Sequence, residues 1–407
     1  MAGEHQAGGL REVQQGLTGD RVRVALFTNN YLPFCGGVTI SVETLRQGLE
    51  ARGHTAWVFA PRFTGCPPDR PRIIRYPSVP AATYPDFCLA VPYSRRITHQ
   101  VRTLDFDVFH AHHPFLLGPA ARRLARRQRR PVVFTYHTRY EKYAHYVPLT
   151  RRLVETAAIR LSTRFAVAAD AVIAPSQVIR DDLRARGVSV PIAVVPTGVD
   201  LERFRPDAAA VARTALGLPG RGPVLLYVGR LDPEKSVGRV LLAFERIAAV
   251  VADARLVVVG QGTEGERLRR QARRLMAAER ITFRGGCAHE ALPAYYQAAD
   301  LFVFASETET QGLVLAEAAA SGLPSVAVSA PGCDEVVRDG ETGLLTKNEP
   351  AALAEAAIGL LLDEARRRGM AERARRVAEQ EFDVRLQIDR TLAVYAEASE
   401  RTEGAAR

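Results

Sequence analysis

The sequence predicts an α/β protein built from two doubly wound, Rossmann-like domains that face each other across a cleft. Short runs of Val, Ile, Leu and Phe alternate with longer helical segments, a pattern typical of parallel strands joined by crossover helices. Both halves of the chain open with a strand, a glycine-bearing loop and a helix, which indicates a structural duplication. Folds of this kind bind ligands at the carboxyl ends of their strands, so we expect the functional site in the cleft.

The expected strands are short apolar runs in two sets, on either side of the Pro- and Gly-containing segment 196–207. Each set is expected to form one open parallel sheet. The first set comprises residues 22–28, 55–60, 107–113, 131–137, 171–176 and 192–196. The second set comprises residues 224–230, 254–260, 281–285, 301–306 and 325–329.

The length of 407 residues suits two domains of roughly 180 residues each. Residues 1–20 contain no apolar stretch like that of a signal peptide, so we expect a disordered leader on a cytoplasmic protein. The two domains are expected to span residues 21–200 and 201–380. The last helix, within residues 381–407, is expected to pack back on the first domain.

The composition argues against several classes of protein. Arg, Asp or Pro interrupts every hydrophobic segment, so no run reaches the roughly 20 apolar residues needed to span a bilayer. The five cysteines are scattered and lack CxxC spacing, which favours neither a disulfide framework nor a zinc site. We expect them to be reduced thiols.

The formal net charge of +10 is concentrated in arginine-rich segments. Residues 121–130 hold six arginines, and residues 151–167 mix arginine with an apolar helical stripe. An anionic membrane face would suit such surfaces, and a peripheral position on the inner membrane face would follow from it. An ordinary solvated helix face is an equal alternative. No nucleic-acid partner is expected, because none of the usual nucleic-acid-binding motifs is present.

The most informative stretch is SETETQGLVLAEAAASG, which follows the expected strand 301–306. Gly312 can open a helix whose free N–H groups, from Gly312 through Leu313 to Val314, form an anion site suited to a diphosphate. Glu309 precedes this helix and Glu317 lies about one and a half turns into it. A carboxylate accepts two hydroxyls at once, which suits the vicinal diols of a hexose and a ribose. The alternative is that both carboxylates only complement the helix dipole.

These residues resemble family 4 glycosyltransferases of the GT-B fold, whose E-x7-E motif appears here as Glu309 and Glu317. The resemblance runs from about Arg21 to the C-terminus. It implies a retaining enzyme that moves a hexose from a nucleotide diphosphate sugar, with the first Glu on the donor sugar and the second on the ribose. It also implies that the first domain binds the acceptor and the second the nucleotide sugar.

Two cations follow the first expected strand of the second domain, in YVGRLDPEKS. Arg230 and Lys235 can hold a diphosphate there and neutralise the charge that grows on the leaving group. The resemblance assigns them this role. In the first domain, Gly36 and Gly37 let the backbone approach a phosphate or sugar, and they match the family's N-terminal glycine loop.

Histidines gather in DVFHAHHPFLLG and FTYHTRYEKYAHYVP, at two expected strand ends. His110, His112 and His113 are possible metal ligands, but they lack an acidic partner of clear spacing, so no metal is expected. His137 matches a family histidine that lies beside the donor sugar near the reacting carbon. A structural role for His137 is the alternative. His113, Tyr140 and Glu141 are expected on the acceptor side.

Two further patterns suggest other functions when taken alone. GQGTEG, which begins at Gly260, fits a dinucleotide fingerprint, but it follows an internal strand, where the family has a nucleotide-sugar loop, so NAD is not expected. Asp105 and Asp107 in LDFDVF resemble a metal-binding DxD pair, but they precede their strand. We therefore expect no cofactor and no strict need for a metal. The backbone near Arg284, in ITFRGGCAHEAL, is expected to meet the nucleotide base.

The expected site residues fall into three groups. The catalytic candidates are His137, Arg230, Lys235 and Glu309. The donor-binding candidates are Gly36, Gly37, Arg230, Lys235, Gly260, Arg284, Glu309, Gln311, Gly312, Leu313, Val314 and Glu317. The acceptor-side candidates are His113, Tyr140 and Glu141.

The acceptor is predicted from TETQGL, HHPFLLG and YEKYAHYVP, which look most like members that glycosylate diacylglycerol or related lipids. The donor, of the UDP-glucose or GDP-mannose type, stays open. One alternative is a family 4 transferase that acts on a soluble or polysaccharide acceptor. Another is a non-catalytic protein that binds sugar nucleotides.

Overall fold

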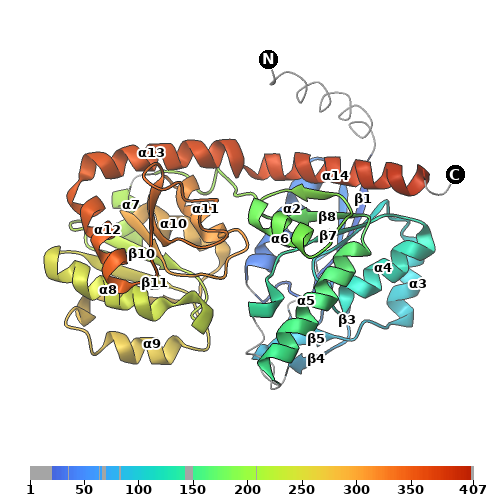
Figure 1. Ribbon diagram of the computed structural model, residues 1–407, viewed down its shortest axis with the longest axis horizontal. Helices are drawn as coiled ribbons and strands as arrows, with labels where there is room; N and C mark the ends of the chain where they lie inside the picture. Colours follow the sequence, from blue (N-terminus) through green and yellow to red (C-terminus); the bar gives the residue numbers. More distant parts are fainter. Residues whose placement is uncertain are drawn as a thin grey trace, which may run out of the picture. The chain divides into compact units, whose positions relative to one another are not determined.

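The computed structural model describes residues 21–34, 36–63, 65–66, 70–81, 84–142, 150–207 and 209–404. The chain divides into two compact units, of which unit 1 is Met1–Pro196 with Val384–Arg407 and unit 2 is Thr197–Asp383. Each unit is a parallel sheet with helices, as the sequence predicted (Figure 1). The expected leader, residues 1–20, lies outside the described residues. How the two units face each other stays a prediction.

The sheet of unit 1 has seven parallel strands in the order β3-β2-β1-β6-β7-β8-β9. Between β3 and β6 in the sequence, β4 and β5 form a separate two-stranded antiparallel sheet. The strands are β1 (Arg23–Phe27), β2 (Thr55–Pro61), β3 (Ile73–Tyr76), β4 (Ser78–Ala81), β5 (Tyr84–Ala90), β6 (Val108–Ala111), β7 (Val132–Thr135), β8 (Ala171–Ala174) and β9 (Ile192–Val194). The helices are α2 (Gly37–Ala51), α3 (Arg95–Thr103), α4 (Leu117–Gln128), α5 (Arg151–Val167), α6 (Gln177–Ala185) and α14 (Val384–Gly404).

Both faces of this sheet are buried, which explains why its strands are continuous apolar runs. Side chains alternate between the faces along each strand, so β1 sends Val24 and Leu26 to one cluster and Ala25 and Phe27 to the other. Helices α2 and α14 complete the first cluster, and α3 to α6 complete the second. The sheet is therefore the middle layer of a three-layer unit.

Helix α14 is tied to unit 1 by both packing and polar contacts. It runs beside α2 (Figure 1), and Ile388 and Tyr395 are fully buried against that face of the sheet. The hydroxyl of Tyr395 lies 2.7 Å from Nδ1 of His110, at the carboxyl end of β6. Arg52, after α2, pairs with Asp389. A segment nearly 200 residues away in sequence from β9 thus completes the core of unit 1.

The sheet of unit 2 has six parallel strands in the order β12-β11-β10-β13-β14-β15. These are β10 (Val224–Val228), β11 (Arg255–Val259), β12 (Ile281–Gly285), β13 (Leu301–Phe304), β14 (Ser325–Val328) and β15 (Gly343–Thr346). The helices are α7 (Ala209–Ala215), α8 (Val237–Val250), α9 (Gly265–Ala272), α10 (Leu292–Ala298), α11 (Leu313–Ala320), α12 (Pro350–Leu362) and α13 (Glu364–Glu381), with short 3-10 turns at Pro233–Lys235, Ala278–Arg280 and His289–Ala291.

One apolar cluster fills unit 2, and two arginines make hydrogen bonds and ion pairs at its periphery. Arg375 of α13 donates to the carbonyls of Phe204 at 2.8 Å and Ala320 at 2.6 Å. Arg213 of α7 pairs with Asp300 at 2.5 Å, just before β13. The bonds of Arg375 satisfy carbonyls at a loop and at the end of α11 that would otherwise lack a partner.

The structure adds strands that the sequence did not predict, namely β3, β4, β5 and β15. Two of them, β3 and β15, are edge strands of four residues each, and both are only partly buried. The expected strands 107–113 and 131–137 end earlier, at Ala111 and Thr135. The histidines that follow them therefore stand beyond the strand ends.

The sequence predicts reduced cysteines and no membrane-spanning segment. No described helix is long and apolar enough to cross a membrane. The described cysteines, Cys66, Cys88, Cys287 and Cys333, are free thiols, and Cys35 lies outside the described residues.

The contact between Tyr395 and His110 yields a stability prediction. Tyr395→Phe leaves a buried imidazole nitrogen without its partner, so we expect unit 1 to lose about 1–3 kcal/mol of unfolding free energy. The fluorescence of Trp57, the one tryptophan of the chain, reports on unit 1 during denaturant unfolding. Tyr93→Phe, at a site that is 73% exposed, is the matched control and should leave the midpoint unchanged. Equal midpoints for the two variants would contradict the bracing role of α14.

Candidate functional site

In unit 2, the candidate cations and the first candidate carboxylate meet at the carboxyl ends of two neighbouring strands. Arg230 and Lys235 follow β10, and Glu309 follows β13, which pairs with β10 in the sheet. Nζ of Lys235 donates to Oε1 of Glu309 at 2.5 Å. Both side chains are mostly buried, with 12% and 14% of their surface exposed. The parallel sheet thus brings together residues that are 74 positions apart.

The guanidinium of Arg230 is held by two carboxylates of its own loop. Nη1 bonds to Asp232, and Nη2 donates to Oε1 of Glu234 at 2.6 Å. Asp232 is fully buried and also accepts hydrogen bonds from the backbone N–H and the hydroxyl of Thr263, at 2.8 and 2.9 Å. Asp232 therefore anchors the loop of Arg230 to the loop that follows β11, and it fixes the direction of the guanidinium.

Glu309 is ionised at neutral pH. Burial alone would raise the pKa of its carboxyl, but Lys235, Ser306 and Arg230 hold the pKa below its ordinary value. The cluster at the end of β10 and β13 therefore consists of charged groups, in which two cations are oriented by three carboxylates.

The first glycine of GQGTEG, Gly260, is required because strand ends pack closely around it. Gly260 has a φ of +149°, and a Cβ placed on it would lie 1.8 Å from the carbonyl oxygen of Gly229. Its N–H donates to the carbonyl of Gly285 at 2.7 Å. A glycine is needed here for the fold of unit 2. Its contact with a donor stays a prediction.

Helix α11 begins where the sequence placed it. Gly312 precedes it with a φ of +78°, a left-handed conformation that favours glycine, and the helix runs over Leu313–Ala320. The N–H groups of its first turn, which include Leu313 and Val314, have no partner inside the helix and make its N-terminus electropositive. Both residues are partly exposed. This terminus lies three residues after Glu309 along the chain.

The side chain of Gln311 is used within unit 2. Its Oε1 accepts from the N–H of Thr197 at 2.7 Å, and its Nε2 donates to the carbonyl of Thr197 at 2.9 Å. Arg284 is exposed, and its guanidinium donates to the carbonyl of Leu216 at 2.5 Å. These bonds give both side chains structural roles. Their roles in donor binding stay predictions.

Glu317 has two partners that the sequence did not indicate. It is buried in α11, its Oε1 lies 2.7 Å from Nε2 of His289, and its Oε2 accepts from the hydroxyl of Tyr296 at 2.8 Å. Each carboxylate oxygen has a second lone pair, so this grip orients the group and leaves capacity for further hydroxyls. His289 and Tyr296 precede Glu317 by 28 and 21 residues, and no local spacing links them to it.

In unit 1, four imidazoles gather at the carboxyl ends of β6 and β7. Nδ1 of His112 lies 2.9 Å from Nε2 of His137, and the two rings stack with 5.1 Å between their centroids. The ring of His110 lies 4.2 Å from that of His112. Its Nε2 bonds to the hydroxyl of Thr135 at 2.7 Å. His112 is thus a partner of His137 that the sequence did not predict.

These imidazoles are neutral at physiological pH. Burial lowers the pKa of His110, His113 and His137 to about 3 each. Nδ1 of His113 accepts from the backbone N–H of Asn29 at 3.1 Å, which places the ring proton of His113 on Nε2. A neutral histidine at this strand end acts as a hydrogen-bonding group and not as a cation.

The remaining unit 1 candidates lie on the segments that follow β7 and β1. Tyr140 packs its ring edge-on against Phe115 at 5.0 Å. Glu141 pairs at 3.0 Å with Arg186, the residue that follows α6, so its carboxylate is held from the end of a neighbouring helix. Gly36 is the residue before α2, its carbonyl accepts the N–H of Ile40, and Gly37 begins the helix.

The described residues hold no group of three or more His, Cys, Asp and Glu arranged to bind a metal ion. Asp107 of the DxD pair accepts the backbone N–H of Arg23 at 2.7 Å, at the amino end of β1. The parallel sheet therefore places this pair at the edge opposite to the candidate histidines.

The chain is similar to known proteins over most of its length. Residues 35–203 match the domain described as Glycosyltransferase Family 4, and residues 210–377 match Glycosyl transferases group 1. The chain is 34% identical over 351 residues to the alpha-monoglucosyldiacylglycerol synthase of Streptococcus pneumoniae (strain ATCC BAA-255 / R6), covering 83% of this chain and 78% of that protein. It is 34% identical over 335 residues to a GDP-mannose-dependent alpha-mannosyltransferase of Mycobacterium tuberculosis (strain CDC 1551 / Oshkosh), covering 80% and 83%.

A solved structure shows a similar fold. The chain is similar to sucrose-phosphate synthase from Thermosynechococcus elongatus, with a TM-score of 0.76 and 25% identity, over 95% of this chain and 100% of that one. This likeness confirms the fold class expected from the sequence. The chain therefore belongs to the family 4 glycosyltransferases of the GT-B fold, and it is a hexosyltransferase.

Proposed function

We propose that this enzyme transfers a hexose, with retention of anomeric configuration, from a nucleotide diphosphate sugar to a lipid acceptor such as diacylglycerol. The observation that carries the proposal is the charged cluster of Arg230, Lys235 and Glu309. Glu309 is followed along the chain by the N-terminus of α11. A diphosphate needs fixed positive charge where the leaving group develops its own charge. This cluster supplies that charge from groups that are already oriented.

The proposed roles follow from the contacts within unit 2. Arg230 and Lys235 neutralise the departing diphosphate, and the N–H groups at the start of α11 bind one of its oxygens. Glu309 accepts hydroxyls of the sugar, and Glu317, held by His289 and Tyr296, accepts those of the ribose. The acceptor hydroxyl attacks from the face that the diphosphate leaves. No described side chain in the cluster is an obvious covalent nucleophile.

Lipid as the acceptor class is supported by the relatives. One is named an alpha-monoglucosyldiacylglycerol synthase, which supports transfer of glucose, from a donor of the UDP-glucose type, to diacylglycerol. Another is named a GDP-mannose-dependent alpha-mannosyltransferase, which keeps GDP-mannose as the second candidate donor. In unit 1, His137 is proposed beside the reacting carbon, with His113, Tyr140 and Glu141 toward the acceptor.

The proposal extends to partners and location. Because arginine and lysine supply the positive charge, we propose that transfer has no strict need for a metal or another cofactor. We propose that the enzyme works in the cytoplasm, as a peripheral protein on an anionic inner membrane face, and that nucleic acid is not a partner. An acceptor in a bilayer requires such an approach from the water phase.

Two other functions are separated from this one by experiment. Transfer to a soluble or polysaccharide acceptor would keep the donor site and dispense with lipid. A non-catalytic sugar-nucleotide-binding protein would bind the donor and release no sugar. The mostly buried, mutually oriented pair of Lys235 and Glu309 favours catalysis, because a protein that only binds has no leaving-group charge to stabilise.

The function is tested by incubating the enzyme in neutral detergent micelles with labelled UDP-glucose, UDP-galactose or GDP-mannose and with diacylglycerol. We expect one donor to give a glycosyl diacylglycerol whose sugar is α-linked, as shown by mass spectrometry and by the anomeric proton coupling. A β-linked product would overturn retention. Transfer to a polysaccharide but not to the lipid would overturn the acceptor, and tight donor binding without turnover would overturn catalysis.

The charge stabilisation is tested by Arg230→Ala and Lys235→Ala. Each removes one cation from the leaving group, so we expect kcat to fall about 10²- to 10³-fold. Arg239→Ala, which removes a half-exposed cation on α8, is the matched control and should retain wild-type kcat. Thermal unfolding of each variant separates loss of function from loss of fold. Wild-type turnover in either active-site variant would refute the assigned role.

The grip on Glu317 is tested by Tyr296→Phe. Loss of one hydrogen bond to a buried carboxylate lets it turn away from the ribose, so we expect KM for the donor to rise about ten-fold. We expect kcat to change little, because the ribose lies away from the bond that breaks. The neighbouring change Tyr295→Phe is the control. A fall in kcat with an unchanged KM would show that Tyr296 acts on the chemistry instead.

A further inference from the structure

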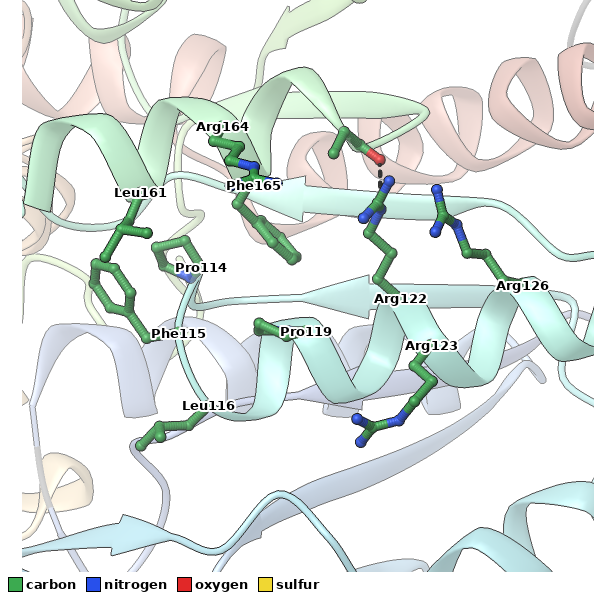
Figure 2. Close-up of a pocket in the computed structure, with 11 residues that line it drawn as sticks. Pro114, Phe115, Leu116, Pro119, Arg122, Arg123, Arg126, Leu161, Arg164 and Phe165 are labelled. Atoms are coloured by element: carbon green, nitrogen blue, oxygen red, sulfur yellow. Dashed lines mark hydrogen bonds between the residues drawn. The ribbon is translucent and has the colours of Figure 1, made fainter. Parts of the chain in front are cut away.

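A groove of about 730 Å³ lies between α4 and α5 of unit 1 (Figure 2). None of the candidate transfer residues lines it, although its lining residue Phe115 packs against Tyr140. Arg122, Arg123 and Arg126 of α4 and Arg164 of α5 line it. None of its eleven described lining residues is acidic. The groove is therefore a concave, positively charged surface contained in one unit.

Two of the groove arginines, Arg122 and Arg123, have neutral partners. Nε of Arg122 donates to the carbonyl of Ala168 at 3.0 Å. Arg123 donates to the carbonyl of Pro92 at 2.9 Å and lies over the ring of Tyr93, 4.5 Å from its centroid. A carbonyl or a ring orients a guanidinium without cancelling its charge. These contacts use one N–H of Arg122 and one of Arg123, so most of the five N–H groups of each of these two guanidinium groups stay available for an anion.

The positive charges also repel one another. Burial, together with Arg126 and Arg164, lowers the pKa of Arg122, and Asp170 opposes this only in part. Like charges so placed raise the free energy of the folded unit. An anion bound among them would relieve this repulsion and would gain charge-assisted hydrogen bonds.

The rest of the groove is apolar, and its rim continues along α5. Phe115, Leu116 and Phe165 form the apolar lining with Leu161, which is 52% exposed. Further along α5, Leu153 is 69% exposed and Val167 is 44% exposed. Exposed leucines beside an arginine cluster suit a ligand with an anionic head and a hydrocarbon body.

We propose that this groove binds the phosphate headgroup of an anionic phospholipid that is not the acceptor of the reaction. The inference rests on the proposed membrane location of the enzyme, and it names the surface and the lipid class. The headgroup pairs with Arg122, Arg126 and Arg164, while Leu161 contacts the glycerol and upper acyl region. A free phosphate would satisfy the arginines and leave the exposed leucine without a role.

The test measures binding of the full chain to phosphatidylcholine vesicles with and without phosphatidylglycerol. The variant Arg126→Gln/Arg164→Gln removes two lining charges. Its matched control, Arg127→Gln/Arg160→Gln, removes two exposed charges from the same helices outside the groove. We expect binding only to the anionic vesicles, weakened about ten-fold or more in the groove variant and within about three-fold in the control. Equal losses in the two variants would overturn the groove as a discrete site.

A second pair of variants separates lipid from free phosphate. Leu161→Gln keeps the charge of the groove, so we expect weaker binding to anionic vesicles and unchanged binding of inorganic phosphate. Val211→Gln, at an exposed site of unit 2, is the control. If Leu161→Gln left vesicle binding unchanged, or if single-stranded RNA bound the groove more tightly than the anionic vesicles, the lipid assignment would be wrong.

The vesicle-binding test of the groove does not depend on whether the proposed sugar transfer is correct. In neutral detergent micelles without anionic lipid, the groove variant should transfer sugar at the wild-type rate, because none of its changed residues belongs to the donor site. Loss of transfer there would show that the arginines serve the reaction, which would overturn the groove as a separate site. An enzyme inactive on every acceptor would refute the proposed function, and the vesicle measurements would still decide the groove.

Discussion

Parallel pairing of strands that are buried on both faces is the constraint on which each unit depends. A central strand such as β1 is apolar at every buried position, from Val24 to Phe27, so functional polar groups are displaced to the loops that follow the strands. The carboxyl ends of β10 and β13, and those of β6 and β7, are where these groups collect. Sheet register therefore decides which distant residues meet, as it does for Lys235 and Glu309.

The two groups of cations in this enzyme are held in different ways. Arg230 and Lys235 are fixed by carboxylates, so their direction is set before any ligand arrives and little reorganisation is needed. In the α4–α5 groove, Arg122 and Arg123 contact carbonyls and an aromatic ring, which orient a guanidinium without neutralising its charge. The first arrangement suits the developing charge of a reaction, and the second suits a permanent anion.

Most of the fold could be predicted from the sequence, because central strands such as 23–27 and 224–228 are short apolar runs between turn residues. The edge strand 343–346 could not, since it is half-buried and carries no comparable signal. For the site, Arg230, Lys235 and Glu309 stood out through their spacing from strands and a helix start. The roles of Asp232, Tyr296 and His112 could not be predicted, because they depend on which side chain each one meets in three dimensions.

The course of α14 has a consequence for the order in which the chain acquires its structure during synthesis. Unit 2 is continuous in sequence, from Thr197 to Asp383, and can fold as soon as it leaves the ribosome. Unit 1 begins earlier but closes later, because its apolar face beneath α14 stays uncovered until Ile388 and Tyr395 have been made. The first half of the protein to be translated is thus the last to be completed.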